Sequence, residues 1–436
     1  AIALAQPLLF NVPVFAKTNR KKLRHACIGV GGMGGHDLSR FNAHPDVEIV
    51  AICDIDENHL AKAAEILPNA KRFTDWRELF AQEADNFDSV NVSVPDHNHF
   101  PIAYTAISKG KHVYCQKPMC HDVSEIRDLT EAAKKAGIIS QLGTQHASGK
   151  GDRTAVQWIK EGHIGKVKQV YLCSNRPGAT EAYRFEGPRP KKGEKVPDHV
   201  HWDQFIGTAP MRPYASKIYH PAKWRAWQDF GTGWSGDIGC HILDAVWKGM
   251  DLKAPISVIA KVQESWKNSP ERNVDTWPQS NHITWVFPGN EMTAENELKV
   301  EWFDGEFYPP EEVRALFSLE NYPAESAMLI GTEGALLIPH TKVPVLLPED
   351  KFKHVKNPVL EDRDHYHYFA DSCLKNVKTE SDFSISGPMS ETVILGTVAI
   401  REPDIFLDWD AKKMRVRNVK KANQHLSRKY RKGWKV

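Results

Sequence analysis

The chain has 436 residues, of which 41% are hydrophobic and 26% charged, with 28 Gly, 27 Pro and no biased tract. This composition excludes a disordered or fibrous protein, and the length predicts two or three domains with a sizeable core. The 57 basic and 55 acidic side chains leave a formal charge of +2, so nucleic acid is not an expected partner.

The first 22 residues are expected to form an N-terminal arm or the remnant of a signal peptide. Residues 1–16 are largely apolar and begin without Met, and a basic, polar stretch follows from Lys17 to Lys22. This pattern favours an exported, periplasmic protein; the alternative is a cytoplasmic protein whose arm packs on the fold. No stretch of about 18 consecutive apolar residues occurs, so no membrane span is predicted.

Residues 23–144 alternate short apolar runs with helical periods. Strands are predicted over residues 25–30, 47–53, 89–94 and 112–115, and helices over residues 34–42, 58–67, 101–108 and 124–136. Strands that alternate with helices imply right-handed crossovers and a doubly wound parallel sheet. The first domain is therefore expected to be an α/β domain of the Rossmann type.

Residues 145–436 have a different pattern. After a helix over 154–162, strands are predicted over residues 166–174, 256–263, 282–287, 298–303 and 327–330. Few helices separate these strands, so the second domain is expected to be α+β, with a mainly antiparallel sheet covered on one face. The Pro- and Gly-rich residues 175–219 are predicted to form a long functional loop.

The strongest local signal is a GxGxxG motif between a predicted strand and a predicted helix. Gly29 would permit the tight turn, Gly31 would let the backbone approach a pyrophosphate, and Gly34 would let the helix pack on the strand. The next strand ends at Asp54, which would bind the ribose hydroxyls and, with no nearby cation, favour NAD over NADP. The predicted cofactor contacts of this segment are Gly29, Gly31, Gly32, Met33, Gly34 and Asp54.

Two polar turns follow the strands at 89–94 and 112–115. Ligands of doubly wound sheets bind outside the carboxyl ends of the strands, where both turns must lie. Lys117 precedes Pro118, which disfavours a helical backbone at Lys117, so its ammonium is expected to point into the crevice and stabilise a substrate alkoxide. The predicted cofactor contacts here are Pro95, His97, His99, Gln116 and Lys117; for the histidine turn the alternative is a helix-capping loop.

A third segment, residues 224–244, combines aromatic and titratable residues. Asp237 and His241 are four residues apart, so on a helix they share a face; His241 could accept a proton and Asp237 could orient the imidazole or the substrate. Tryptophans beside hydrogen-bonding groups suit a sugar ring, although they also commonly fill cores. The predicted substrate contacts are His146, Tyr219, His220, Trp224, Arg225 and Trp227.

The 7 cysteines are an odd number, and no two of them form a CxxC motif. Most lie in apolar runs typical of strands, which favours buried free thiols over a disulfide framework. No metal site is predicted.

These stretches, in this order, resemble the Gfo/Idh/MocA family, and especially a branch common among exported members. The resemblance implies an N-terminal Rossmann domain, a C-terminal α/β domain with a large open sheet, and a homo-oligomeric, NAD(P)-dependent enzyme acting on sugars and polyols. It also implies that Lys117, Asp237 and His241 are the catalytic set. Gln116 replaces the Glu of the family's Glu-Lys-Pro motif, so the neighbouring ammonium has a weaker partner.

The leading hypothesis is an NAD-dependent oxidoreductase that transfers hydride between a carbohydrate or cyclitol hydroxyl carbon and nicotinamide. A second hypothesis is a redox-neutral glycosidase or lyase that retains its NAD, which would suit an exported protein. A third is a sugar-binding protein with a vestigial site. In each case the expected partner is a small carbohydrate.

Overall fold

The computed structural model describes residues 22–176, 183–185 and 188–436. The proposed signal remnant, and with it the prediction of export, lies outside the described residues. Part of the long loop predicted at 175–219 also lies outside them.

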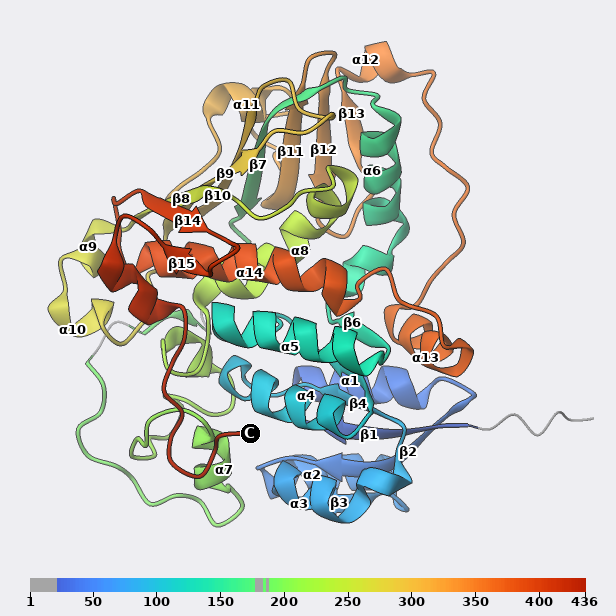
Figure 1. Cartoon of the computed structure of the whole chain (residues 1–436), viewed down its shortest axis with the longest axis vertical. Coiled ribbons are helices and arrows are strands. Elements are labelled where there is room, and N and C mark those ends of the chain that lie inside the picture. Colours follow the sequence, from blue (N-terminus) through green and yellow to red (C-terminus); the bar gives the residue numbers. More distant parts are fainter. Residues whose placement is uncertain (1–21, 177–182, 186–187) are drawn as a thin grey trace, which may run out of the picture.

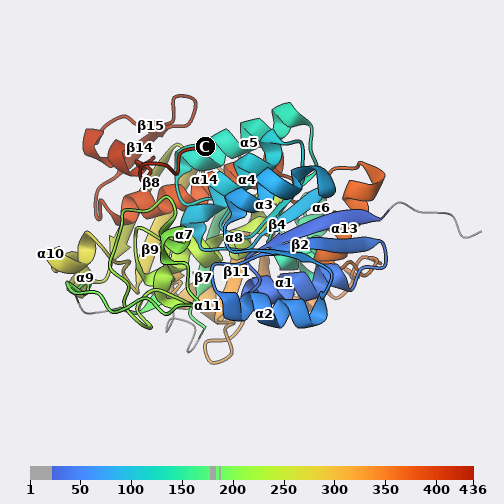
Figure 2. The ribbon, with the colours of Figure 1, turned by 90° about the horizontal axis from the view of Figure 1, so that it is seen from below.

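The N-terminal domain is a six-stranded parallel sheet in the order β3-β2-β1-β4-β5-β6. Its strands are β1 (Leu23–Ile28), β2 (Val47–Cys53), β3 (Lys71–Phe73), β4 (Ser89–Val92), β5 (His112–Cys115) and β6 (Ser140–Leu142). Its helices are α1 (Met33–Asn42), α2 (Glu57–Ile66), α3 (Trp76–Glu83), α4 (His99–Ser108) and α5 (Val123–Ala136). Helices α1 and α2 cover one face and α3, α4 and α5 the other (Figure 2). The predicted Rossmann fold is confirmed, and the strand order reverses beside β1, where ligands of such sheets bind.

Local sequence explains where α5 begins and ends. The Asp122 side chain accepts from the Glu125 backbone while the Glu125 side chain accepts from the backbone at 122, which forms a capping box. The helix ends at Gly137, whose φ of 65° is a left-handed conformation that a glycine adopts without strain.

The C-terminal domain contains a nine-stranded sheet in the order β13-β12-β11-β7-β10-β9-β8-β14-β15. Its strands are β7 (Val167–Ser174), β8 (Ser257–Val262), β9 (Asn281–Pro288), β10 (Glu297–Asp304), β11 (Glu325–Gly331), β12 (Ala335–Pro339), β13 (Val345–Leu347), β14 (Leu407–Asp410) and β15 (Arg415–Val416). Of its neighbouring pairs, β7 and β10 run parallel and the others antiparallel. The predicted mainly antiparallel sheet is confirmed; β12 to β15 were not among the predicted strands.

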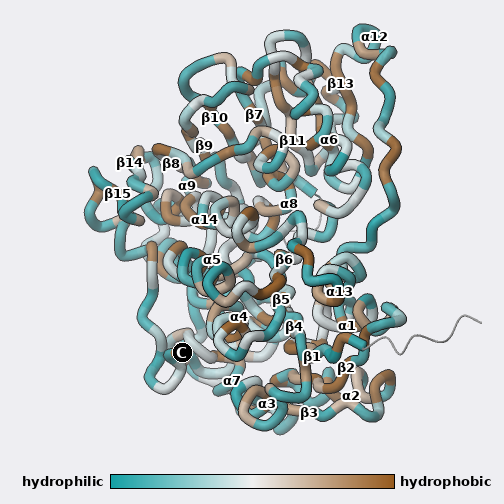
Figure 3. The backbone as a smooth tube through the Cα atoms, turned by 45° about the vertical axis from the view of Figure 1, so that its right-hand side comes forward, coloured by the Kyte–Doolittle hydropathy of each residue, from teal (hydrophilic) through white to brown (hydrophobic). Residues whose placement is uncertain are grey.

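Two long helices separate the sheets: α8 (Gly233–Gly249) and α14 (Phe383–Ile400) lie between the nine-stranded sheet and the Rossmann domain (Figure 1). The close approach of α14 to β9 depends on Gly396, because a Cβ there would lie 2.7 Å from the Trp285 ring. The other helices are α6 (Lys150–Glu161), α7 (Trp202–Ile206), α9 (Glu264–Lys267), α10 (Pro270–Asn273), α11 (Glu311–Ala315), α12 (Glu349–Phe352) and α13 (His365–Lys375). Hydrophobic and hydrophilic stretches alternate along the chain in Figure 3, as expected where elements turn one side to a core.

Among the described residues, α14 is the one helix long and apolar enough to cross a membrane. Within the protein 83% of this segment is buried, and a core helix meets the same criteria of length and composition.

The last residues of the chain return to the Rossmann domain (Figure 1). Trp434 packs near Trp76 of α3, with ring centroids 6.5 Å apart, and the Arg77 guanidinium lies 4.0 Å from the Trp434 ring centroid. Arg431 donates to the carbonyl oxygen of Gly207, which follows α7. The tail therefore fastens residues 202–207 of the second domain onto the first.

Candidate active site

The glycine motif forms the predicted strand-to-helix turn. Gly29 has a φ of +82°, and a Cβ there would lie 2.2 Å from the carbonyl oxygen of Ser93. A Cβ on Gly34 would lie 2.1 Å from the carbonyl oxygen of Gly29. Both positions therefore require glycine for the turn to sit this close to β4.

Asp54 lies at the end of β2 and shapes the glycine turn. Its Oδ2 accepts from the backbone N–H groups of Val30 (2.8 Å) and Gly31 (3.1 Å), and its Oδ1 accepts from that of Asp56 (2.9 Å). The imidazole Nδ1 of His59 lies 3.3 Å from Oδ1. Asp54 thus has a structural role besides the predicted contact with ribose.

His59 also lines the cavity and was not among the predicted site residues. A Cβ on Gly31 would lie 2.2 Å from His59 Nδ1, so the missing side chain at Gly31 makes room for this imidazole. His59 occupies the first turn of α2, and the signal available in the sequence is its spacing of five residues from Asp54. The absence of a Cβ at Gly31 is explained here by a contact within the protein.

A cavity of about 370 Å³ runs from the glycine turn to Lys117 and Asp237. This volume lies in the range of small-molecule sites. The predicted site residues that line it are Gly29, Gly31, Gly32, Met33, Gly34, Asp54, Pro95, Gln116, Lys117, His220, Trp224, Arg225 and Asp237. The structure therefore brings the proposed dinucleotide site and part of the proposed catalytic set together in one space.

Lys117 and Asp237 form a nearly buried ion pair, with Nζ 2.5 Å from Oδ1. Arg225 approaches the other carboxylate oxygen, with Nε 3.7 Å from Oδ2. Asp96 accepts from the backbone N–H and the hydroxyl of Thr232 at 3.1 and 3.0 Å. Burial and the nearby Asp237 carboxylate raise the pKa of Asp96 to about 7. The strong perturbation of a buried carboxyl beside Lys117 marks Asp96 as a further functional candidate.

His241 lies on α8 one turn after Asp237. Burial and the Lys117 ammonium hold the pKa of His241 well below its usual range, so the ring is neutral. Within the described residues, its Nδ1 is buried without a hydrogen-bond partner. The rings of His340 and His146 lie 5.3 and 6.2 Å away. His340 was not among the predicted site residues, because it follows β12, which was not a predicted strand.

His97 and His99 do not contact the cavity, which corrects the prediction that they bind the cofactor. Both side chains are fully buried. His97 Nε2 lies 2.8 Å from the Phe205 carbonyl oxygen, and His99 lies 2.7 Å from that of Pro118 through Nδ1. Their rings hold the turns on either side of the crevice in place.

Gln116 donates through Nε2 to Asp37 Oδ2 at 2.8 Å. Burial raises the pKa of Asp37, and a Glu at position 116 would place a second carboxylate against it. This contact explains why an amide stands at position 116 in this chain.

The aromatic segment divides into two parts. Trp224 and Arg225 line the cavity, and the Arg225 guanidinium lies 4.2 Å from the Trp224 ring centroid. Tyr219 and Trp227 are instead fully buried in an aromatic core with Phe230, which corrects the prediction that they bind substrate. Residues 199–225, the covering segment, supply several of the residues that line the cavity, and these two rings pack in their core.

His220 lines the cavity at the end that carries the glycine turn. Its Nε2 lies 2.9 Å from Asp56 Oδ2, beside Asp54 and the glycine turn. The turn that carries His220 crosses onto the start of α2, so this imidazole lies at the end of the cavity predicted to hold the adenosine ribose.

Substitution of Arg225 tests the assignment of the substrate end. Arg225→Ala is expected to raise KM for the sugar by about 5- to 100-fold, because hydrogen bonds to a charged partner are lost, while Kd for NAD stays nearly unchanged. Lys223→Ala, two residues away in the same turn and outside the cavity lining, is the control for steady-state kinetics. An unchanged KM in Arg225→Ala would remove Arg225 from the substrate site.

Substitution of Asp54 tests the choice of cofactor. Asp54→Ala is expected to weaken NAD binding by about 1–3 kcal/mol, since the ribose loses a charged hydrogen-bond acceptor. Calorimetric titration of the parent and the variant with NAD and NADP measures both effects, and the parent should bind NAD more tightly. A parent that prefers NADP would contradict the assignment.

The fold and the cavity define a two-domain protein with an NAD-binding Rossmann domain. Residues 23–144 match the model of an oxidoreductase family with an NAD-binding Rossmann fold, and residues 153–289 match the C-terminal alpha/beta domain of that family. The chain belongs to the Gfo/Idh/MocA oxidoreductase family, as the motifs predicted.

Curated relatives include inositol 2-dehydrogenase from Corynebacterium glutamicum, 33% identical over 37% of this chain and 48% of that protein. Myo-inositol 2-dehydrogenase from Thermotoga maritima is 26% identical over 36% of this chain and 46% of that protein. The chain thus spans about half the length of the curated relatives it matches.

Solved structures with the same fold include the WlbA dehydrogenase from Chromobacterium violaceum, in complex with NADH and UDP-GlcNAcA. It is 15% identical with a TM-score of 0.62, covering 92% of this chain and 99% of that chain. The apo scyllo-inositol dehydrogenase from Lactobacillus casei is 15% identical with a TM-score of 0.55, covering 88% of this chain and 96% of that chain.

Proposed function

We propose that the protein is an NAD-dependent oxidoreductase that oxidises a hydroxyl-bearing carbon of a carbohydrate or cyclitol. The observation that carries this proposal is that one cavity joins the glycine turn and Asp54 to the ion pair of Lys117 and Asp237. The similarity to inositol dehydrogenases supports the class of substrate.

The glycine turn and Asp54 would hold the dinucleotide, which supplies a hydride acceptor when bound. The Lys117 ammonium would donate to the substrate hydroxyl and stabilise the developing alkoxide, with Asp237 holding Lys117 in position. Neutral His241 would accept the hydroxyl proton. The alcohol carbon thus loses a hydride and its oxygen a proton, so a ketone forms with balanced charge.

The charges at this end of the cavity favour an uncharged sugar over a strongly charged one. Lys117 is paired with Asp237, and Arg225 also approaches that carboxylate. Trp224 offers a buried aromatic surface beside these groups, which matches the apolar C–H face and polar edge of a sugar ring.

A second candidate is redox-neutral glycoside cleavage with a retained NAD. The contacts between the covering segment and the start of α2, at the ribose end of the cavity, favour it. The backbone N–H of His201 donates to the Ile55 carbonyl oxygen (2.8 Å), and that of Glu57 donates to the His199 carbonyl oxygen (2.9 Å). The cover would slow exchange of the cofactor, and a redox-neutral cycle needs a cofactor that stays bound.

Reaction stoichiometry separates the two functions. The cofactor that copurifies is identified by mass spectrometry, and the protein is then incubated with NAD and a panel of inositols, aldoses and glycosides. One NADH formed per ketone supports the oxidoreductase, and cleaved product without net NADH supports the redox-neutral enzyme. Tight binding of NAD without turnover of any sugar would contradict both.

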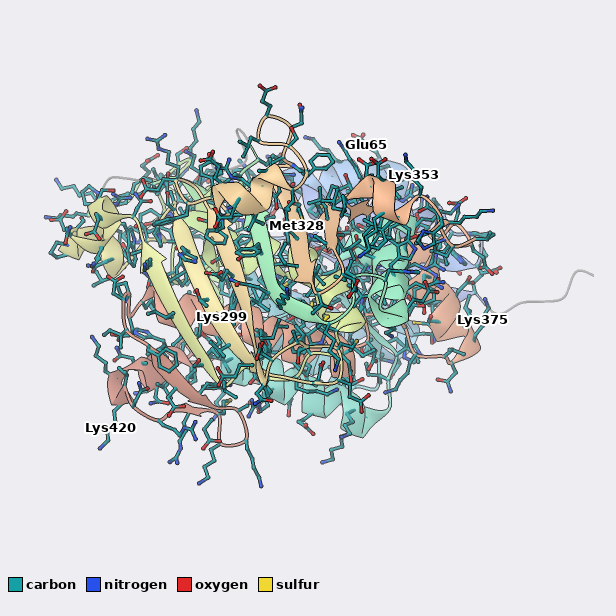
Figure 4. All side chains as sticks on the ribbon, turned by 90° about the horizontal axis from the view of Figure 1, so that it is seen from above. Glu65, Lys299, Met328, Lys353, Lys375 and Lys420 are labelled. Atoms are coloured by element: carbon teal, nitrogen blue, oxygen red, sulfur yellow. The ribbon has the colours of Figure 1, made fainter. Side chains whose placement is uncertain are left out.

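We also propose that the protein is a homo-oligomer that uses an open face of the nine-stranded sheet. Figure 4 looks onto this sheet, with Lys299 of β10 labelled. Along β9 buried residues alternate with the half-buried His282, Thr284 and Val286, as expected for a face without a packed helix layer. Light scattering coupled to size-exclusion chromatography should give a mass above one chain; a monomeric mass would contradict this proposal.

A further inference from the structure

Three side chains able to bind a metal ion meet at the ribose end of the cavity. They are Asp56, the N-cap of α2; His59, in the first turn of α2; and His220, from the segment that covers the cavity. One ligand atom of each lies within 4.8 Å of those of the other two. The oxidoreductase reaction proposed above uses none of these three groups.

We propose that Asp56, His59 and His220 bind a divalent transition-metal ion of the Zn²⁺ type. Two imidazoles and one carboxylate form a ligand set common in sites of such ions, which leave a position open for water or another ligand. Two of the ligands come from the Rossmann domain and one from the second domain, so the ion would join the two domains.

The spacing of the ligand atoms suits this coordination. Ligand atoms about 2.1 Å from a four-coordinate ion lie about 3.4 Å from each other. His220 Nε2 and Asp56 Oδ2 are already 2.9 Å apart, and the 4.8 Å limit on the other pairs leaves side-chain movements of about 1 Å. His59 and His220 also line the main cavity, which provides a route for the ion.

The surroundings of His59 provide a second, independent argument. Metal-bound imidazoles commonly donate their other N–H to a carboxylate, and Asp54 Oδ1 lies 3.3 Å from His59 Nδ1. The carboxylates of Asp54 and Asp56 bring negative charge to the cluster, which attracts a cation. The second oxygen of Asp56 accepts from the Asn58 backbone at 3.0 Å, which fixes the carboxylate.

Metal titration of the full chain, freed of metal with a chelator and then dialysed, tests the proposal. With Co²⁺ at pH 7.5 the visible absorption bands of four-coordinate cobalt are expected to saturate at one ion per chain. Calorimetry with Zn²⁺ should give a Kd below about 10 µM. His59→Ala and His220→Ala should each weaken binding by at least about 100-fold, because loss of a metal ligand costs more than loss of an outer hydrogen bond.

His201→Ala is the matched control. This imidazole lies in the same covering segment, pairs with Glu57 at 2.9 Å, and is outside the cluster, so its removal should leave the affinity for Zn²⁺ unchanged. Saturation of the parent without four-coordinate cobalt bands would overturn the proposal, whatever the stability of the variants.

Equal binding by the parent and a His59→Ala/His220→Ala double variant would also overturn the proposal. It would place the ion elsewhere, for example among His146, His241 and His340, and leave the ribose-end cluster as a hydrogen-bonded clamp. Neither measurement needs substrate or NAD, so the result is independent of the proposed oxidoreductase activity.

Discussion

His241→Ala is expected to lower kcat by about 10²- to 10⁴-fold, the range typical of a lost general base, while the Kd for NAD changes little. The structure supplies the reason: His241 is neutral, lies one helical turn from Asp237, and has a ring nitrogen without a partner among the described residues. Steady-state kinetics and cofactor titration measure the two effects. His163→Ala, at a half-buried histidine paired with Glu161, is the control.

The pH profile provides a second test of the same assignment. A base acts in its neutral form, so activity is lost as the pH falls through its pKa. Because burial and Lys117 hold that pKa well below its usual range, the acid limb of kcat due to His241 should lie below about pH 6.5. Normal turnover by His241→Ala would contradict this assignment. The proton acceptor would then be a neighbouring imidazole, and the rings of His146 and His340 lie nearest to His241.

The Rossmann domain could be predicted because its signals are local. Each crossover combines a short apolar strand with a helix of 8 to 14 residues, and GxGxxG and Asp54 lie at two successive strand ends. Strands β3, β6, β13, β14 and β15 were not predicted because they have only two to four residues. Strand β12 was not predicted because its five residues are all buried and show no alternation. The place of β14 is decided by β8, which is distant in sequence, whereas β12, β13 and β15 each pair with the strand that precedes them.

The difference between local signals and tertiary packing also explains which of the predicted site residues line the cavity. Lys117 and Asp237 belong to motifs whose spacing points them into the crevice. The positions of His97 and Tyr219 depend instead on tertiary packing: the carbonyl that holds His97 belongs to Phe205, 108 residues away. Histidine and tyrosine are both residue types that commonly bind ligands. Because distant segments bury His97 and Tyr219, each belongs to the scaffold of the site.

A buried charge cluster holds the C-terminal tail on α5. Arg428 reaches α5, with Nε 2.8 Å from Asp122 Oδ2 and Nη2 2.9 Å from Glu125 Oε1. It also donates to the carbonyl oxygen of His97 at 2.6 Å, and the Tyr430 hydroxyl donates to Glu125 at 2.6 Å. Both carboxylates are almost completely buried and also form the capping box of α5.

Arg428→Ala is therefore expected to lower the free energy of unfolding by about 3–5 kcal/mol, because two buried carboxylates lose their cation. Chemical denaturation measures this loss. Arg415→Ala, which removes an exposed partner 3.5 Å from Asp410, should leave the free energy of unfolding nearly unchanged. Arg428→Lys keeps the charge without the planar fork and should fall between the parent and Arg428→Ala. Equal stability of Arg428→Ala and Arg415→Ala would mean that the carboxylates stay neutral when the guanidinium is absent, and that Arg428 does not hold the tail on α5.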